Sequence, residues 1–214
     1  MLELLIGSKN YSSWSLRPWL ALTQAEIPFR EVVISMHQPT WREQTRVRSP
    51  NGKVPMLQDG PLQVAESLAI LEYVAERSPQ AELWPRDLNA RAIARAVSAE
   101  MHAGFADLRQ ELAMNILLRK RVVPSDKAAA NIARIETLWA DCRGRYADAG
   151  PFLFGHFTIA DAMFAPVVTR LVTYEIAVKD QTREYMDTVL GLPAMKSWEQ
   201  GARDEAARGE GDYK

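Results

Sequence analysis

The chain of 214 residues is long enough for one large domain or two small ones, and 47% apolar and 25% charged residues are typical of a globular protein with a sizeable core. A formal net charge of -1 excludes the strong basic field that attracts nucleic acid or an anionic membrane surface. The sequence shows no basic leader with an apolar core and no apolar run of about 18 residues. We therefore expect a cytoplasmic protein that neither binds nucleic acid nor enters a membrane.

Cysteine and histidine are too sparse for a metal centre. Cys142 is the only cysteine, so the chain can form neither an intramolecular disulfide nor a cysteine-based metal site. His37, His102 and His156 are far apart and show no H-x-x-x-H spacing. The sequence therefore predicts a protein without a metal cofactor.

The first eighty residues read as strands alternating with helices. Residues 2–6 are a short apolar run ended by Gly7, and a β-branched segment at 29–34 follows a helical pattern at 16–25. After a connection, two short strands at 54–57 and 62–64 flank an Asp-Gly-Pro turn, and a helix follows at 66–76. A β-α-β unit implies a parallel strand pair, and the hairpin adds antiparallel strands. We expect a small mixed sheet with helices packed on it.

The remainder of the chain is predicted to be helical. Residues 79–87 carry two prolines and no periodicity, which indicates a linker between a domain at 1–78 and a helical domain at 88–214. The expected helices are one long helix over 93–116, a second over 132–146, a buried third over 158–172 and a last one over 193–207, before a frayed tail at 209–214. The long helix is inferred from one apolar stripe, namely Ile93, Val97, Met101, Phe105, Leu108, Leu112 and Ile116.

The segment NYSSWSLRPW, residues 10–19, crowds hydroxyls at the first strand–helix junction. Proline is best tolerated in the first turn of a helix, so Pro18 places the N-cap near Ser15. Ser12 and Ser13 then lie just before the helix, at the carboxyl end of the strand, where open α/β sheets bind ligands. Their hydroxyls and the positive end of the helix dipole could stabilise an anion. The alternative is that the serines only cap and turn the backbone.

Two further stretches point to a peptide-like ligand. Pro55 opens a strand, which predicts a cis Val54–Pro55 bond and a Val54 backbone free to pair with an extended peptide; the alternative is a trans proline on an edge strand. Glu66 and Ser67 open a helix, where a hydroxyl and free amides suit a carboxylate and Glu66 suits an ammonium group. A ligand with both groups is an α-amino acid, and the alternative role is helix capping.

Taken together, these stretches resemble the cytosolic glutathione transferase family. Residues 49–55, SPNGKVP, are similar to its N-P-x-G-K-V-P segment, and residues 65–73, AESLAILEY, are similar to its E-S-x-A-I-x-x-Y-L signature. Thr158 to Asp161 is similar to the S/T-x-A-D element that caps a buried helix, and its capping-box spacing makes Asp161 a predicted structural residue. SSWS at 12–15 resembles the S-S-C-S of zeta members, which implies a serine-type, theta- or zeta-like bacterial member.

The resemblance implies an α/β thioredoxin-like N-terminal domain plus an all-α C-terminal helical bundle, and it implies glutathione as co-substrate. Ser12 or Ser13 would hold the thiol, and Val54 would pair with the cysteinyl backbone. Glu66 and Ser67 would hold the γ-glutamyl end, and Lys53, with Gln38, the glycyl carboxylate. The implied electrophile pocket, between the domains, is formed by Trp14, Met101, His102, Phe105, Arg109, Met114 and Asn115. The alternative for the wall from the long helix is a core methionine and a solvated or paired His102–Arg109 face.

The implied function is a glutathione transferase of the detoxification type, a homodimer whose glutathione thiolate attacks a small electrophile. Trp14 stands where the zeta motif has cysteine. Thiol–disulfide exchange by an enzyme cysteine at this turn is therefore excluded, and maleylacetoacetate isomerase activity is disfavoured. The alternatives are a glutathione-dependent isomerase or peroxidase, and a non-catalytic glutathione-binding stress protein.

Overall fold

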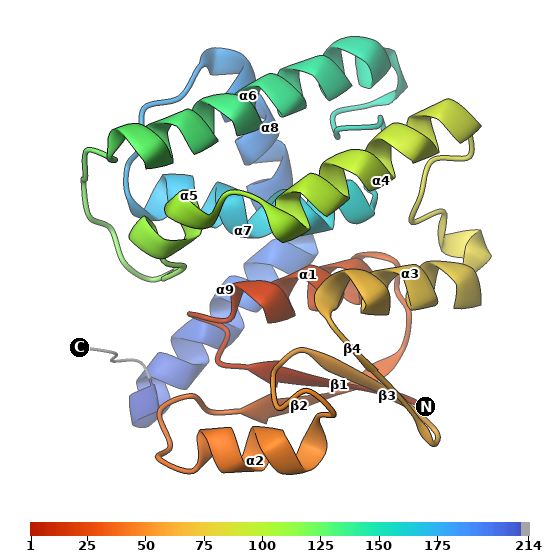
Figure 1. Cartoon of the computed structure of the whole chain (residues 1–214), viewed down its shortest axis with the longest axis vertical. Helices are drawn as coiled ribbons and strands as arrows, with labels where there is room; N and C mark the ends of the chain where they lie inside the picture. The colour runs from red at the N-terminus through yellow and green to blue at the C-terminus, as the bar shows by residue number, and fades with distance from the viewer. Residues whose placement is uncertain (211–214) are drawn as a thin grey trace. The chain divides into compact units, whose positions relative to one another are not determined.

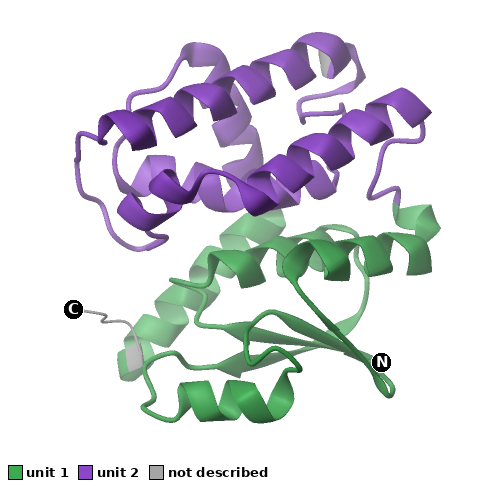
Figure 2. Ribbon diagram, viewed as in Figure 1, with its two compact units in different colours: residues 1–81, 193–214 green, residues 82–192 purple. Residues whose placement is uncertain are grey.

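The computed structural model describes residues 1–210, except for the side chains of Ala147 and Glu210. The chain forms two compact units, one of residues 1–81 with the segment from Pro193 onward, the other of Glu82–Leu192 (Figure 2). The expected frayed tail at 209–214 lies largely outside the described residues. Within residues 1–210, no helix combines the length and apolarity that crossing a membrane requires.

The first unit is built on a four-stranded sheet in the order β2-β1-β3-β4. Its strands are β1 (Leu2–Gly7), β2 (Phe29–Ile34), β3 (Met56–Asp59) and β4 (Leu62–Ala65). β1 runs parallel to β2, and β3 runs antiparallel to both β1 and β4, so the predicted mixed sheet is confirmed. Leu4, Leu5 and Ile6 of β1 are fully buried, because this strand is central and covered on both faces.

Helices cover both faces of this sheet (Figure 1). The helices of the first unit are α1 (Ser13–Gln24), α2 (Trp41–Arg48), α3 (Ser67–Arg77) and α9 (Pro193–Glu205), with a 3₁₀ turn at Pro79–Ala81 and a π-helical segment at Ala206–Glu210. α1 and α3 pack together on one face, and α2 lies on the other. The residues of α2 had suggested only a connection, because its sequence is strongly polar and buries only Thr45.

The start of α1 differs from the sequence-based expectation. The N-cap is Ser12, whose C=O accepts from the N–H groups of Ser15 and Leu16, both at 3.1 Å. Pro18 therefore lies inside the helix, where it removes only the hydrogen bond to the C=O of Trp14. The prediction that Ser15 is the cap is wrong, and its hydroxyl instead accepts from the N–H of Gly7 at 3.2 Å.

The second unit is a helical bundle around a buried central helix. Its helices are α4 (Leu88–Ala103), α5 (Ala106–Glu111), α6 (Asp126–Tyr146), α7 (Ile159–Thr173) and α8 (Asp180–Gly191), with a 3₁₀ turn at Ala147–Ala149. α7 packs against α4 and α8, and α6 packs against α5 and α8. Nearly every residue of α7 is buried, as its apolar sequence predicted. α8 was not predicted.

The single long helix expected over 93–116 is wrong. α4 ends at Ala103, and Phe105 adopts a left-handed conformation with φ 58° before α5 begins. Gly104 also approaches the helix closely, since a Cβ there would lie 2.8 Å from the C=O of Glu100. Leu112 and Ile116 are buried in irregular backbone, so their spacing imitated a helical stripe without forming one.

The last helix returns to the first unit. Trp198 of α9 packs edge-on against Trp19 of α1, with ring centroids 5.0 Å apart. The contacts thus group α9 with the sheet, whereas the sequence had placed it in a helical domain over 88–214. The division into domains at 1–78 and 88–214 with a linker at 79–87 stays a prediction.

Candidate active site

A tight turn delivers the hydroxyls of the NYSSWS segment to the end of β1. The C=O of Ser8 accepts from the N–H groups of Tyr11 at 3.1 Å and Ser12 at 2.9 Å. We call residues 8–13 the serine turn. It places Ser12 and Ser13 at the junction of β1 with the N-terminus of α1, where the helix dipole favours an anion.

The two serines differ in their hydrogen bonding. The hydroxyl of Ser12 donates to Oγ of Ser15 at 2.7 Å, so its hydrogen is already used in a bond within the fold. Oγ of Ser13 makes no hydrogen bond with any of residues 1–210. Of the two, Ser13 has the hydroxyl that is available to a ligand.

Both serines line a cavity of about 330 Å³, which we call the serine cavity. The aromatic residues in its wall are Tyr11, Trp14 and Trp41, and the basic ones are Arg42, Arg46 and Lys53. Neither Arg42 nor Arg46 forms an ion pair with a residue in the described part of the chain. The cavity therefore joins a hydroxyl to a wall with unpaired positive charge.

A second cavity of about 170 Å³ adjoins the first, and we call it the Glu66 cavity. It shares Trp14, Lys53 and Val54 with the serine cavity. The Val54–Pro55 peptide bond is cis, as predicted. Neither the N–H nor the C=O of Val54 is hydrogen-bonded to any residue within 1–210, so both remain available to a peptide.

Glu66 and Ser67, at the start of α3, line the Glu66 cavity. Glu66 is exposed, and its carboxylate accepts a hydrogen bond from Nδ2 of Asn51 at 3.2 Å. Its φ is 72°, which is a strained value for a residue other than glycine and costs about 1–3 kcal/mol. Ser67 is only 1% exposed, and its hydroxyl has no hydrogen-bond partner among the described residues. A buried unpaired hydroxyl costs a further ~1–3 kcal/mol. Strain and an unpaired hydroxyl thus occur side by side at one cavity.

The structure does not bring Gln38 to either cavity. Gln38 is exposed, and its Oε1 accepts from Nε2 of Gln44 at 3.1 Å. Arg42 and Arg46 of α2 line the serine cavity instead. The sequence pattern did not reveal them, because the residues of this segment were interpreted as a connection, although their i, i+4 spacing would place both on one helix face.

The residues predicted to form an electrophile wall in the second unit have structural contacts there. Met101, Phe105 and Met114 are buried in the helical core. Arg109 donates to the C=O groups of Met101 and Gly104 at the end of α4, and burial lowers its pKa. The break between α4 and α5 also removes the shared helix face that was expected for His102 and Arg109.

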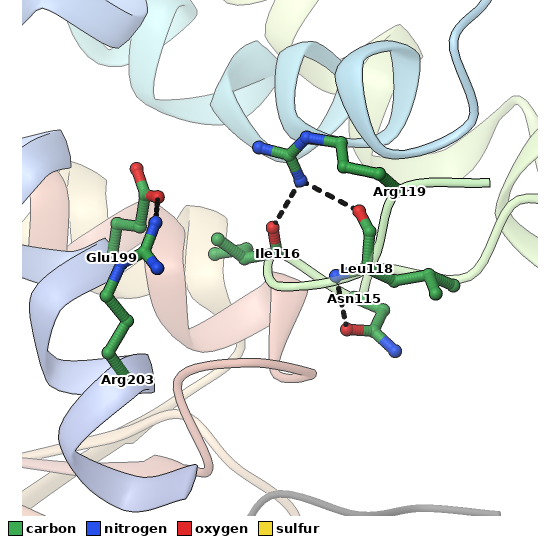
Figure 3. Close-up of polar contacts among 6 residues, drawn as sticks. All are labelled: Asn115, Ile116, Leu118, Arg119, Glu199 and Arg203. Atoms are coloured by element: carbon green, nitrogen blue, oxygen red, sulfur yellow. Dashed lines mark hydrogen bonds and ion pairs between the residues drawn. The ribbon is translucent and has the colours of Figure 1, made fainter. Parts of the chain in front are cut away.

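Asn115, the last residue of the predicted wall, stabilises a loop. Its Oδ1 accepts from the N–H of Leu118 at 3.2 Å, and Arg119 donates to the C=O groups of Ile116 and Leu118 in the same loop (Figure 3). Of the predicted electrophile residues, only Trp14 lines the two cavities described above. The wall from the second unit stays a prediction.

Asp161 is a structural residue, as its capping-box spacing predicted. Its buried carboxylate accepts from the N–H of Thr158 at 2.8 Å, the Thr158 hydroxyl at 3.0 Å, the N–H of Leu153 at 3.1 Å and the Tyr185 hydroxyl at 3.1 Å. Burial is the largest influence on its pKa and raises it to about 6. Asp161 thus stabilises the start of α7 and is remote in sequence from the serine turn.

The only thiol in the sequence is that of Cys142. Cys142 is buried, which raises the pKa of its thiol to about 11, so the thiolate is scarce at neutral pH. Across residues 1–210, no group of three or more His, Cys, Asp or Glu side chains is arranged to hold a metal ion.

Comparison with known proteins defines the class. The sequence profile of the glutathione S-transferase N-terminal domain matches residues 11–77, and that of the C-terminal domain matches residues 91–200. The chain therefore belongs to the glutathione S-transferase family and is an enzyme of that family.

The relatives include proteins named as isomerases and proteins named as transferases. A probable maleylacetoacetate isomerase of Caenorhabditis elegans is 28% identical over 166 residues, which covers 75% of this chain and 74% of the relative. Human glutathione S-transferase theta-1 is 29% identical over 169 residues, covering 76% of this chain and 65% of the relative. The chain is thus similar to both an isomerase and a transferase.

Solved structures agree on the fold. A glutathione transferase homologue from Burkholderia, solved with bound glutathione, aligns with a TM-score of 0.69 and 23% identity over 95% of this chain and 98% of its own. A diazinon-metabolizing glutathione S-transferase of the silkworm Bombyx mori aligns with a TM-score of 0.72 and 18% identity over 96% and 98%. The thioredoxin-like unit and the helical unit are those of this family.

Proposed function

We propose that this chain is a serine-type glutathione transferase that binds glutathione along the two adjoining cavities. The observation that carries the proposal is the buried, unpaired hydroxyl of Ser67 beside the strained backbone of Glu66. A folded protein that leaves a buried hydroxyl unpaired loses stability, and a ligand carboxylate would recover the loss by accepting its hydrogen bond.

Each end of the tripeptide has a matching group. In the Glu66 cavity, the carboxylate of Glu66 attracts the γ-glutamyl ammonium, and Ser67 with the first amides of α3 receives the γ-glutamyl carboxylate. The unpaired N–H and C=O of Val54 pair with the cysteinyl backbone. Lys53, supported by Arg42 and Arg46, receives the glycyl carboxylate in the serine cavity.

Ser13 is the proposed donor to the sulfur. A free thiol has a pKa of about 8.5, and making the thiolate the major form at neutral pH needs roughly two units, or about 2.7 kcal/mol. One hydrogen bond to a charged group supplies about 1.5–3 kcal/mol, and the N-terminus of α1 adds about 0.3–1 kcal/mol. A hydroxyl at a helix start is therefore sufficient, and no general base is needed.

The chemical step follows from a stabilised thiolate. The sulfur lone pair forms a bond to an electrophilic carbon, and the electron pair of the broken bond leaves with the departing group. Ser13 keeps its proton throughout and only donates a hydrogen bond. The hydrogen bond from Ser13 weakens as the sulfur loses negative charge. It therefore stabilises the thiolate and not the thioether product.

A glutathione-dependent isomerase is the second candidate, because several relatives carry the name maleylacetoacetate isomerase. Reversible addition of the thiolate to a conjugated double bond would allow rotation before elimination, and this uses the same stabilised thiolate. Trp14, which stands in place of the cysteine of the zeta motif, weighs against it. An assay for adducts of an aryl halide and an assay for cis–trans isomerisation separate the two activities, and inactivity in both with intact glutathione binding would indicate a non-catalytic protein.

Calorimetric titration with glutathione tests the binding proposal. We expect Ser67→Ala to weaken binding by about 10- to 150-fold, the fold-change of one hydrogen bond to a charged group. Ser98→Ala is the matched control, because Ser98 in α4 also has a fully buried hydroxyl without a partner among the described residues. Absence of binding by the wild-type chain, or equal binding by all three proteins, would contradict the proposed site.

We also propose that the chain forms a homodimer, as the family resemblance implies. Light scattering at micromolar concentration should then give about twice the mass of 24.1 kDa. A mass equal to that of one chain would contradict the dimer and would leave the glutathione site untouched, because every residue assigned to that site lies in one unit.

A further inference from the structure

The C-terminal helix α9 holds the backbone of the serine turn. Lys9, the second residue of that turn, donates its N–H to Oε2 of Glu205 at 2.8 Å, and its C=O accepts from Nε1 of Trp198 at 2.9 Å. The acceptor, Glu205, and the donor, Trp198, lie 196 and 189 positions later in the chain. α9 therefore satisfies both polar groups of one turn residue.

The side chain of Lys9 is enclosed as well. Its Nζ lies 2.8 Å from Oε1 of Glu31 and above the rings of Trp19 and Trp198, at 5.2 and 5.6 Å from their centroids. Only 12% of this side chain is exposed, so the cation–π contacts are partly desolvated and stronger than on an open surface. We call Lys9, Trp19, Glu31, Trp198 and Glu205 the Lys9 clamp.

The residues of α9 next to Lys9 leave room for the lysine side chain. A Cβ at Gly201 would lie 2.6 Å from Cδ of Lys9, so glycine makes room for the lysine chain where the helix passes the turn. Trp198 and Glu205 are both almost fully buried on this side of α9. Elsewhere on α9, Arg203 pairs with Glu199 one turn away, and this pair is more exposed (Figure 3).

The clamp fixes the peptide group whose C=O anchors the serine turn, because the N–H of Lys9 and the C=O of Ser8 belong to one planar peptide unit. Lys9 lies between Ser8, whose C=O anchors the amides of Tyr11 and Ser12, and the residues that carry the hydroxyls. A turn has little stability of its own, because few buried apolar contacts hold it. Fixing the Lys9 peptide groups from outside therefore limits how far Ser12 and Ser13 can move.

We propose that Trp198 and Glu205 are positioning residues for thiol activation, so that α9 sets the place of the serine hydroxyl through the backbone of Lys9. This inference rests on the proposed function for its catalytic consequence, whereas the clamp on the turn stands independently of it. Neither residue needs to touch glutathione, and their contribution is a fixed donor position in the thiolate complex.

Trp198→Phe removes the Nε1 donor and keeps an aromatic ring beside Lys9 and Trp19. We expect amide hydrogen exchange in the peptide covering residues 8–13 to rise by about 2- to 13-fold, the fold-change that one hydrogen bond is worth. The pKa of the thiol of bound glutathione should rise by about 0.4–1.1 units, which is the same 2- to 13-fold change expressed in the acid dissociation constant. Glutathione affinity at low pH, where the thiol is protonated, should change less than twofold.

Trp139→Phe is the matched control. Trp139 is as buried as Trp198 and packs edge-on against Phe164, but its Nε1 has no hydrogen-bond partner among the described residues. Both substitutions remove the same atoms from a core, and we expect the control to leave the thiol pKa and the exchange of residues 8–13 unchanged while lowering the melting temperature.

Conservative replacement of Glu205 separates positioning from packing. Glu205→Gln keeps an oxygen for the N–H of Lys9 and should retain the wild-type thiol pKa, whereas Glu205→Ala should raise it as Trp198→Phe does. Glu199→Ala, on the same helix but away from the turn, is the control.

Three outcomes decide the inference. Faster exchange in residues 8–13 with a raised thiol pKa supports it. A lower melting temperature with unchanged exchange and unchanged thiol pKa overturns it, because α9 then only packs on the sheet. Faster exchange in a chain whose wild type binds no glutathione leaves the clamp in place and contradicts the proposed function instead.

Discussion

The starts of α7 and α3 carry similar polar residues, and they differ in how those residues are satisfied. At α7, the buried carboxylate of Asp161 accepts hydrogen bonds from Thr158, Leu153 and Tyr185. At α3, the buried hydroxyl of Ser67 has no partner among the described residues, and the backbone of Glu66 is strained. The polar groups at the start of α7 are satisfied within the fold, whereas at the start of α3 the hydroxyl of Ser67 has no partner among the described residues.

This difference gives a physical criterion for function. A buried polar group that is fully hydrogen-bonded stabilises the fold, and its removal harms folding. A buried polar group without a partner reduces stability, so its retention at a cavity points to a ligand. By this criterion Asp161 is a stability residue and Ser67 is a candidate binding residue, although both occur in short motifs at helix starts.

The largest expected effect is that of Asp161→Ala. The substitution removes a helix cap worth about 0.5–2 kcal/mol and leaves buried donors on Leu153 and Tyr185 unpaired, each at ~1–3 kcal/mol. We expect the free energy of unfolding to fall by about 3–5 kcal/mol in urea denaturation. Protein that remains folded should bind glutathione as the wild type does, and loss of binding by a folded variant would reverse the comparison.

The pH dependence of stability sharpens the same contrast. The pKa of Asp161 is about 6 in the folded chain and lies near 3.8 without burial. A raised carboxyl pKa contributes stability that is fully present below about pH 4 and is lost as the pH rises through about 6. The free energy of unfolding of the wild type, measured against Asp161→Asn, should therefore fall by about 3 kcal/mol across this window.

Urea titrations of both proteins at several pH values between 4 and 7 measure this difference. The Asn variant lacks the titrating group, so all other carboxyls cancel in the comparison. A difference that stays constant with pH would show that the hydrogen bonds to Asp161, and not its burial, dominate its pKa.

Much of the fold was accessible from the sequence, because short-range signals are strong in this chain. The strands at 2–6 and 29–34, the hairpin around Asp59-Gly60 and the buried helix at 159–173 follow from apolar pattern and turn residues. The break at Gly104–Phe105 escaped detection, because Leu112 and Ile116 are buried at helical spacing without being helical.

The residue types of the candidate site were predictable from the sequence, whereas the hydrogen-bond partners of these residues were less predictable. Val54, Glu66 and Ser67 line the cavity that their motifs indicated. The clamp on Lys9 depends on long-range packing, namely the return of α9, that no local pattern encodes. The bond between Ser12 and Ser15 is local, but the residue types alone did not show which hydroxyl has a partner. Gln38 lines neither cavity, because it lies in the turn before α2, whereas Arg42 and Arg46 lie on α2 itself.

Alanine substitution of the two serines should split catalysis from structure at the start of α1. Ser13→Ala is expected to raise the pKa of bound glutathione by about one to two units, or roughly 1.4–2.7 kcal/mol, because it removes the available donor. Ser12→Ala should chiefly lower the melting temperature, because its hydroxyl bonds to Ser15. The thiolate absorbance of bound glutathione, followed through a pH titration, measures the first effect. If neither single variant nor the double variant shifts that titration, the hydroxyls serve only the backbone.

The smallest expected effect is that of Gln38→Ala on glutathione binding. Gln38 is exposed, bonds to Gln44 and lines neither cavity, so its removal should change the dissociation constant less than about twofold, or ~0.4 kcal/mol. Arg46→Gln is the comparison variant, since Arg46 lines the serine cavity and makes no ion pair with described residues. We expect it to weaken binding about 2- to 5-fold at low salt, within the ~0.2–1 kcal/mol range of an exposed charge pair, and less at high salt. Calorimetry at two salt concentrations compares them, and a larger loss for Gln38→Ala than for Arg46→Gln would restore the original assignment of the glycyl end.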